Sequence, residues 1–458
     1  MIWQRQVISI ASVLLLILPL ASSGAPIGES ARGERRKRSL EAQPALIDTI
    51  VVEGAYVTKP HVILREMTLQ PGARVTPEDL REDAHRIQNL GLFARVQLEL
   101  RRQDGRNVLV VDVTEQWYIL PLPFWQKEGD DFSKITYGFE YLQRNFRGRN
   151  ERISVRLWIG FERGYQLGYS NPWFAGKGTW GTSVSLFRMT RDIRNEKYRE
   201  LDAEIKMTGG NMAIQRRFGL DTRLTATLSF TRYSTLYPEL MVSNSRTDNW
   251  ISANLALLLD ERDLYEYPSE GWYRMLNLSG GMLLNGPGLL TDHTTVGASY
   301  EVRRYYPIFL DFILCGKTLV GISAIHLPLY RRYFLGTDED TRVRGWQGEV
   351  EEGEGIFLGS LELRRHISNI RYLTWNRAPI ARRYFRNLKY GLSGGLFFDL
   401  GQTWIHPSEA TSRKFQTGWG VGLHLHLPYL EVLRLEAGWS PDAKFGDAAI
   451  SIRSRVAF

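Results

Sequence analysis

Three groups of side chains in this sequence have types and spacings that could do chemistry. Gly391, Ser393 and Gly395 fit the pattern G-x-S-x-G, in which a serine nucleophile stands on a sharp turn between a strand and a helix. His424 and His426 lie two residues apart, so on a strand both would point to the same side, as metal ligands sometimes do. The third group is an acidic run that could attract cations: Glu349, Glu351, Glu352 and Glu354.

None of these groups predicts an active site or a metal centre. Ser393 lies where only strand patterns occur, whereas the nucleophile turn requires a helix to follow. The two histidines have no third ligand nearby in the sequence, which favours polar side chains facing the lumen of the strand-rich region described below. The acidic run lacks the ligand spacing of a calcium loop and favours a solvated loop. No glycine loop typical of phosphate or dinucleotide binding is present, so we expect no enzyme and no cofactor.

The N-terminus indicates export. Residues 7–18 are almost purely apolar behind Arg5, and small residues follow up to Ala25, which predicts a secretory signal peptide over residues 1–25. The apolar run is too short to cross a bilayer comfortably as an anchor. Residues 26–46 contain a basic cluster that a lipid surface could bind, but the glycines and the proline around it favour a flexible basic tether. Because the chain is exported, nucleic acid is not expected as a partner.

Residues 47–117 predict a small α+β domain with the order strand, helix, helix, strand, strand. The second helix is the best marked, because Thr76 can cap it, Pro77 suits its first turn and Gly91 ends it. Apolar and charged residues then alternate over residues 93–101, and a turn at Asp104 leads into the returning strand.

Helical periodicity disappears after Pro121 and Pro123, and half-apolar strands of period two recur from about residue 133 to residue 458. Such strands behind a signal peptide indicate a closed β-barrel, because a bilayer admits only structures that satisfy all backbone hydrogen bonds internally. The 12% aromatic residues and 42 glycines are typical of this class. At about 9–11 residues for each spanning strand, the region has room for on the order of 16 strands. A secreted adhesin or propeller is the alternative, but no repeat of fixed period supports it.

Several stretches resemble a known family. The element order of residues 47–117, with the run Asn-Leu-Gly-Leu-Phe at 89–93, resembles a POTRA domain, a periplasmic module. Four later stretches are similar to the bacterial outer-membrane assembly-factor superfamily of the BamA/TamA type. They are a VRG-aromatic loop motif (Val343, Arg344, Gly345, Trp346), an F-x-D-x-G strand (Phe397, Asp399, Gly401), a mid-barrel D-x-R-D element (Asp260, Arg262, Asp263) and a penultimate hairpin around residues 420–435. The last strand contains Ile450, Ile452, Val456 and Phe458.

The resemblance implies a POTRA-like periplasmic domain (residues 47–117) followed by a transmembrane antiparallel β-barrel (residues 125–458) in the bacterial outer membrane. It implies an assembly factor that inserts unfolded outer-membrane proteins by strand addition between a first strand near residues 134–142 and a last strand near 448–458. The partners implied are the lipid bilayer and these clients, with periplasmic accessory proteins or chaperones. A polypeptide secretion pore of the two-partner type and a passive channel remain alternatives, because one POTRA domain fits where BamA-type proteins usually carry several.

In this family the VRG motif lies at the tip of an extracellular loop that folds back into the lumen. An arginine in a partly dry lumen is costly unless it is paired, and a carboxylate on an inward-facing strand position suits its planar fork. We therefore predict that Arg344 pairs with Asp399 and holds the loop on the barrel wall.

Overall fold

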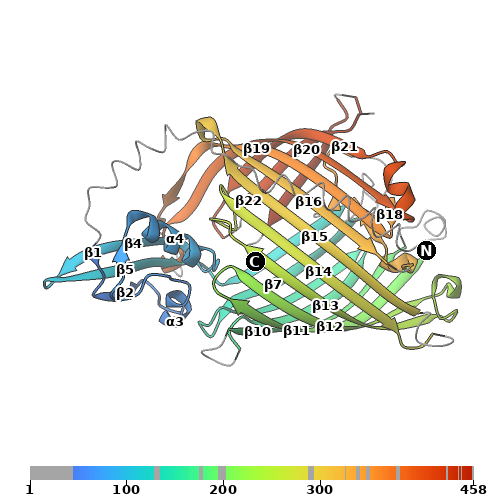
Figure 1. The fold of residues 1–458 in the computed structure, drawn as a ribbon, viewed down its shortest axis with the longest axis horizontal. Coiled ribbons are helices and arrows are strands. Elements are labelled where there is room, and N and C mark those ends of the chain that lie inside the picture. Colours follow the sequence, from blue (N-terminus) through green and yellow to red (C-terminus); the bar gives the residue numbers. More distant parts are fainter. Residues whose placement is uncertain are drawn as a thin grey trace, which may run out of the picture.

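A computed structural model describes residues 45–455 as a small N-terminal domain at one end of a large barrel-like sheet (Figure 1). Not described within this range are residues 128–134, 175–178, 194–202, 287–292, 325, 337–340, 347–350, 378–381, 430–431, 442 and 445. The predicted signal peptide, the predicted tether up to residue 44, and Val456 and Phe458 also lie outside the described residues. In the part of the chain that the structure describes, no helix is both long and apolar enough to cross a membrane.

The N-terminal domain has the predicted order of strand, helix, helix, strand and strand. Its sheet has the order β2-β5-β4, with β2 parallel and β4 antiparallel to β5. Its elements are β1 (Ala45–Leu46), β2 (Thr49–Glu53), α3 (Pro60–Leu64), β3 (Arg74–Val75), α4 (Pro77–Gln88), β4 (Phe93–Gln103) and β5 (Arg106–Glu115). β1 pairs with β3, so strand pairing already begins at the end of the segment predicted as a tether.

Helix α4 begins where the capping residues direct it. The hydroxyl of Thr76 accepts a hydrogen bond from the backbone N–H of Asp79 at 3.2 Å, and the carboxylate of Asp79 accepts one from the backbone N–H of Thr76 at 2.8 Å. This reciprocal pair satisfies two donors at the helix start. One turn later, the fully buried Asp83 accepts hydrogen bonds from the backbone of Thr68 and Leu69, which offset the cost of burying its charge.

The large sheet is antiparallel and has 16 strands, which confirms the predicted fold and strand number. The strands follow one another in chain order, from β6 to β16 and then from β19 to β23. They are β6 (Ile119–Lys127), β7 (Ile135–Phe146), β8 (Glu151–Gly160), β9 (Arg163–Asn171), β10 (Trp180–Asp192), β11 (Glu204–Phe218), β12 (Thr222–Thr235), β13 (Thr247–Asp260), β14 (Gly271–Leu283), β15 (Thr294–Pro307), β16 (Ile313–Ser323), β19 (Gly355–Leu373), β20 (Leu388–Trp404), β21 (Gln416–His426), β22 (Val432–Trp439) and β23 (Ala449–Arg455). The sheet is not closed, since the described residues contain no pairing between its two end strands, β6 and β23.

The predicted position of the first strand is wrong. Residues 134–142 fall on the second strand of the sheet, β7, while the first strand, β6, begins at Ile119 directly behind the N-terminal domain. The predicted strands began beyond Pro121 and Pro123, and proline interrupts a central strand. An edge strand tolerates proline, and β6 is an edge. The last strand, β23, lies within the predicted range and contains Ile450 and Ile452.

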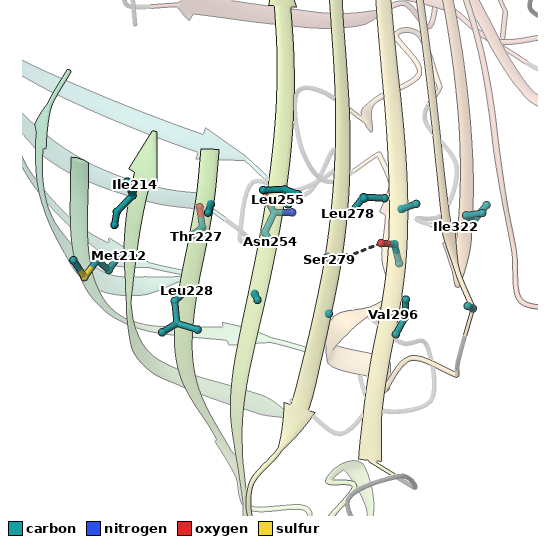
Figure 2. Close-up of a pocket in the computed structure, with 16 residues that line it drawn as sticks. Met212, Ile214, Thr227, Leu228, Asn254, Leu255, Leu278, Ser279, Val296 and Ile322 are labelled. Carbon is teal, nitrogen blue, oxygen red and sulfur yellow. Dashed lines mark hydrogen bonds between the residues drawn. The ribbon is translucent and has the colours of Figure 1, made fainter. Parts of the chain in front are cut away.

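Alternation along the strands gives the sheet one apolar outer face. Leu228, for example, exposes 56% of its surface. Together with other apolar side chains it lines a shallow depression of about 800 Å³ over β11 to β16 (Figure 2). Ala253 and Gly280, which lie opposite each other on β13 and β14, leave the space between Leu255 and Leu278. A hollow lined this way suits lipid tails, which make no hydrogen bonds, and offers no polar ligand site.

The N-terminal domain is fixed to turns at the near end of the barrel. Arg217, at the end of β11, donates two hydrogen bonds to the carboxylate of Glu66, behind α3, at 2.8 and 2.6 Å. Their side chains are only 10% and 7% exposed. Asn89, after α4, donates to the carbonyl of Asp263 at 3.0 Å and accepts from the backbone N–H of Tyr265 at 2.8 Å. Both contacts join the domain to turns at the end of the sheet beside it.

A further contact lies beside the first strand. Asn145, near the end of β7, donates to the hydroxyl of Thr58 at 2.9 Å. That hydroxyl donates in turn to the carboxylate of Glu115 at 2.7 Å and lies 3.0 Å from the hydroxyl of Tyr118, just before β6. Burial, and then the negative charge of Glu115, raise the pKa of Tyr118, so its hydroxyl keeps its proton. The domain is thus tied to both strands at this end of the sheet.

Replacing Arg217 with alanine should loosen the N-terminal domain, because Glu66 then loses the partner of its buried charge. We expect a loss on the order of 3 kcal/mol in the free energy that holds the domain on the barrel. Hydrogen exchange should become faster in α3 and in the turn after β11. Arg216→Ala is the matched control, since this neighbouring side chain is exposed on the other face of β11. Equal protection in the two variants would show that the ion pair does not hold the domain.

Candidate functional site

The loop that contains Val343 and Arg344 connects β16 with β19 and folds against the wall. Inside it, β17 (Tyr333–Leu335) pairs with β18 (Glu351–Gly353). Leu335 and Val343 are buried in an apolar cluster with Ile356 and Leu358 of β19, and Trp346 packs against this cluster. The loop is therefore anchored by apolar packing on the strand that follows it.

Arg344 uses every donor of its guanidinium. Nε and Nη2 donate to the two carboxylate oxygens of Asp399 at 2.7 and 2.8 Å, so the predicted pairing is present. Nη1 donates to Glu362 at 2.8 Å and to Glu436 at 3.0 Å, and Nη2 also donates to the hydroxyl of Ser360 at 3.0 Å. The backbone N–H of Arg344 adds a bond of 3.0 Å to Asp399. A planar group with five donors thus meets five acceptor contacts.

The charges around Arg344 balance. Its three carboxylate partners stand on β19, β20 and β22, and each side chain is less than a tenth exposed. Two further arginines approach Glu362, with Arg364 Nε at 3.8 Å and Arg434 Nη1 at 3.6 Å. Three arginines and three carboxylates sum to no net charge, which is the condition under which so many ions can be buried together. Of this set, the sequence indicated only Arg344 and Asp399.

Glycines allow the loop tip to lie directly on the wall. Gly345 has a φ of +90°, a conformation that other residues rarely adopt. A Cβ atom at Gly418 of β21 would lie 1.9 Å from the carbonyl oxygen of Arg344. Any side chain at Gly418 would therefore push the loop away from the strands that supply its carboxylates.

The three residues that define the F-x-D-x-G motif, Phe397, Asp399 and Gly401, all face the loop. The ring of Phe397 lies against the guanidinium, with 3.9 Å between its centroid and Cζ of Arg344. Asp399 supplies the bidentate carboxylate. A Cβ atom at Gly401 would lie 2.9 Å from Cγ2 of Val343, so this position makes room for the loop's apolar residue. The two motifs, distant in sequence, therefore form one contact surface.

The D-x-R-D element is in a different place. Asp260, Arg262 and Asp263 lie at the turn between β13 and β14, where Arg262 donates to both carboxylate oxygens of Asp260 at 2.7 Å. The carboxylate of Asp263 accepts hydrogen bonds from the backbone N–H of Ser269, at 2.9 Å, and from its hydroxyl. These bonds shape the turn whose backbone contacts Asn89 of the N-terminal domain.

A polar cluster on β19, β20 and β21 contains Ser393 and three histidines. The hydroxyl of Ser393 lies 2.9 Å from Nδ1 of His366 and 2.8 Å from Nε2 of His426, and the hydroxyl of Tyr267 lies 3.0 Å from Nδ1 of His424. His366 is the third histidine that the sequence did not indicate, because only strand pairing places it opposite Ser393. Among the described residues, no three histidine, cysteine or acidic side chains are arranged to hold a metal. Ser393 also lies within a strand and not on a nucleophile turn.

The acidic run is not a solvated loop, which corrects the prediction. Glu352 belongs to β18 and pairs with Arg332 at 2.9 Å. Glu354 is buried, and its carboxylate lies 3.0 Å from Nδ1 of His326. The β17–β18 hairpin folds these carboxylates onto the wall, where they need partners. Glu349 lies outside the described residues.

Two family models match this chain. One, described as the Omp85 superfamily domain, matches residues 145–449, and the other, a POTRA model described as surface antigen variable number repeat, matches residues 45–116. The first covers more than half of the chain. The chain belongs to the Omp85 superfamily. Omp85 proteins of this type are outer-membrane barrels with periplasmic POTRA domains, so this Omp85 chain has its barrel in the outer membrane and its N-terminal domain in the periplasm.

Curated relatives of this Omp85 chain are assembly factors. It is 28% identical over 307 residues to the outer membrane protein assembly factor BamA of Neorickettsia risticii. The aligned region covers 63% of this chain and 39% of the relative. It is 27% identical over 375 residues to a putative outer membrane protein assembly factor of Treponema pallidum. Here the aligned region covers 70% of this chain and 42% of the relative. The chain thus spans about two fifths of the length of these relatives.

Solved structures share the fold. BamA from Haemophilus ducreyi lacking POTRA domains 1–3 aligns over 90% of this chain and 84% of its own, with a TM-score of 0.51 and 15% identity. CdiB from Escherichia coli aligns over 90% of this chain and 75% of its own, with a TM-score of 0.54 and 14% identity. At these identities the likeness shows the fold alone, and this fold is common to both proteins.

Replacing Arg344 with alanine should release the loop, because it leaves buried carboxylates on three strands without their shared cation. Breaking such a pair costs roughly 3–5 kcal/mol. We expect faster protease cleavage between β16 and β19 and a lower temperature at which the barrel loses its folded mobility on gels. Arg344→Lys should recover only part of the loss, since an ammonium lacks the planar fork.

Arg342→Ala is the matched control for this experiment. Arg342 lies in the same loop and forms no ion pair with the described residues, so its loss should leave the cleavage rate unchanged. A double variant, Arg344→Met with Asp399→Asn, should be more stable than Arg344→Ala because it removes opposite charges together. Equal cleavage of Arg344→Ala and wild type would refute the anchoring role.

Proposed function

We propose that this Omp85 chain is an outer-membrane protein assembly factor that inserts its clients by strand addition at a weak seam, the boundary between β6 and β23. The observation that carries the proposal is the open sheet, in which neither end strand has a partner on its outer side among the described residues. Unpaired backbone groups are costly in hydrocarbon, and an unpaired edge is a template for another strand. A client strand could therefore lower the free energy of the open sheet by pairing with it.

The loop around Arg344 supports this proposal by stiffening one side of the seam. Its carboxylate partners lie on β19, β20 and β22, and β22 is the strand next to β23. An ion cluster that spans these strands holds their register fixed. The edge that receives a client would then stand on a rigid wall, and thinning of the bilayer beside the seam would lower the barrier to insertion.

The N-terminal domain is suited to receive a client before it reaches the seam. It is tied to the turns near β6, and its outer strands β2 and β4 each pair on one side only within the three-stranded sheet. An extended peptide can add to such an edge. Unfolded outer-membrane proteins are therefore the proposed clients, and periplasmic chaperones or accessory proteins would deliver them.

A polypeptide secretion pore is the second candidate function. The fold likeness to CdiB, a two-partner secretion pore, favours it and extends over 90% of this chain. In a pore the polypeptide would pass through the lumen, so the loop held by Arg344 would have to move aside. In an assembly factor the loop stays in place while the seam opens. A passive channel would need neither movement.

Folding of an unrelated outer-membrane barrel into liposomes, with and without the full-length protein, tests the proposed function. We expect client folding to become faster by about tenfold or more, because the template edge replaces unpaired backbone in the barrier. Deleting residues 47–117 should abolish most of this gain if the domain delivers clients. The matched control is Arg216→Ala, which leaves the domain contacts intact.

Two other outcomes would contradict the proposal. Unchanged client folding together with large ion conductance in Arg344→Ala, but not in wild type, would favour the secretion pore. Unchanged client folding with the same conductance in both proteins would favour a passive channel.

A further inference from the structure

Two arginines flank one tryptophan on the outer face of the barrel, at the end beside the N-terminal domain. Cζ of Arg304 lies 4.5 Å from the ring centroid of Trp272, and Cζ of Arg274 lies 5.9 Å from the same centroid. Trp272 and Arg304 stand opposite each other on β14 and β15, and Arg274 follows Trp272 on the same face of β14. The indole ring attracts both guanidinium groups and so holds the two cations next to each other.

The register of β14 and β15 places these arginines on the lipid-facing side. Leu278 and Ala298 stand opposite each other further along the two strands, and both line the apolar hollow in the outer face (Figure 2). Trp272 precedes Leu278 by six residues, and Arg304 follows Ala298 by six. Side chains an even number of residues apart share one face of a strand. The arginines and the hollow therefore belong to one continuous surface.

The spacing between the arginines and the hollow matches half of a bilayer. Six residues of strand span about 20 Å, which at the usual tilt of barrel strands is roughly 15 Å along the membrane normal. The apolar band of such barrels is about 25 Å tall. A phospholipid whose phosphate lies at the arginines would thus place the ends of its acyl chains in the hollow, near the middle of the bilayer.

Arg304 needs an anion that the described residues do not supply. Nη2 of Arg274 donates to the carboxylate of Glu261 at 2.7 Å, whereas Arg304 forms no ion pair with the part of the chain that the structure describes. On the periplasmic side of Arg304 the same face continues with Tyr306 and Leu314, which stand opposite each other and expose 46% and 41% of their surface. An arginine between apolar, lipid-facing side chains is costly unless an anion pairs with it.

The charges around the indole ring define the kind of anion. Arg274 and Arg304 contribute two positive charges and Glu261 contributes one negative charge, which leaves one positive charge on this face. A phosphodiester carries a single negative charge, and its oxygens can accept two parallel hydrogen bonds from a guanidinium. A headgroup with an ammonium of its own would bring another cation next to the arginines. A lipid with a net negative charge therefore fits this face better than a zwitterionic one.

We propose that Arg304 and Arg274, with Trp272 between them, bind the phosphate of an anionic phospholipid in the periplasmic leaflet, and that its acyl chains occupy the hollow over β11 to β16. The arginines stand on β14 and β15, which pair with a neighbour on both sides in the middle of the sheet. The site is therefore separate from the two end strands, and it does not depend on the function proposed above.

Native mass spectrometry of the full-length protein in detergent tests the site, with phosphatidylglycerol as the anionic lipid and phosphatidylcholine as the zwitterionic one. We expect the first phosphatidylglycerol to bind about tenfold more tightly than phosphatidylcholine, because its charge balances that of the arginines. Arg274→Gln together with Arg304→Gln should remove this preference by weakening phosphatidylglycerol binding about tenfold. Each single variant should give a smaller loss.

Arg216→Gln is the matched control for the arginine variants. Arg216 also stacks on two rings of the outer face, those of Trp180 and Phe218, but among the described residues no second arginine shares these rings. Its replacement should leave the affinity for the first phosphatidylglycerol unchanged.

Glu261→Gln provides a test in the opposite direction. It removes the negative charge beside Arg274, so phosphatidylglycerol should bind about threefold more tightly. A gain of affinity does not result from partial unfolding, so this variant keeps the test decisive if the double arginine variant does not fold. Unchanged or weaker binding by Glu261→Gln would contradict the proposed charge balance.

Gly280→Leu tests whether the acyl chains lie in the hollow. A Cβ atom at Gly280 would meet only the carbonyl oxygen of Thr295, at 3.8 Å, so a leucine fits there and fills the hollow. We expect wild type to prefer long-chain over short-chain phosphatidylglycerol and Gly280→Leu to lose this preference, because the chain ends lose their apolar contact. Ala437→Leu is the matched control, since Ala437 on β22 stands opposite the exposed Val421 and far from the hollow.

Three further results would overturn the inference. Equal affinity of wild type and the double arginine variant would show that the arginines do not hold the phosphate. Equal affinity of wild type for the two lipids would remove the anionic headgroup from the proposal. A dimer that Gly280→Leu abolishes, in a protein that retains no lipid, would assign the hollow to a second copy of the chain.

Discussion

A buried guanidinium needs a hydrogen-bond acceptor for each of its donors. In this barrel the acceptors of Arg344 come from several strands, and their positions depend on how these strands are arranged. No single strand supplies three carboxylates at one point, so the contacts require β19, β20 and β22, with β21 between the last two, to lie in the observed register. They also require the backbone of the loop to lie directly against the backbone of the barrel strands. A side chain at Gly345 or Gly418 would prevent this approach. A loop, four neighbouring strands and a neutral set of ions thus form one rigid unit.

The rigid unit ends where the open edge begins. β22 takes part in the ion cluster, whereas β23 beyond it pairs, within the described residues, with β22 alone. On the opposite side of the seam, β6 is joined to β7 and to the periplasmic domain. The two edges therefore differ in their support, although both belong to one continuous sheet.

The sequence predicted those features that depend on local pattern. Alternation of period two predicted the strands because a bilayer leaves few other structures, and Thr76 marked the start of α4 because its hydroxyl can satisfy a free N–H. The pairing of Arg344 with Asp399 was accessible through the resemblance of both motifs to a known family. Glu362, Glu436 and His366 were not, because strands from different parts of the chain bring them together. β6 was missed because its prolines are compatible with a strand only at an edge, and a single sequence does not indicate which strand is an edge.

The close attachment of the periplasmic domain has a mechanical consequence. The chain passes from β5 into β6 through a few residues, and the hydrogen bond between Thr58 and Asn145 fixes the same domain to the end of β7. The ion pair between Glu66 and Arg217 provides a second, more distant point of support. Two contacts and a direct covalent connection therefore join the domain to the barrel. A force applied to the domain would reach the barrel through β6 and these two contacts, without passing through the lipid.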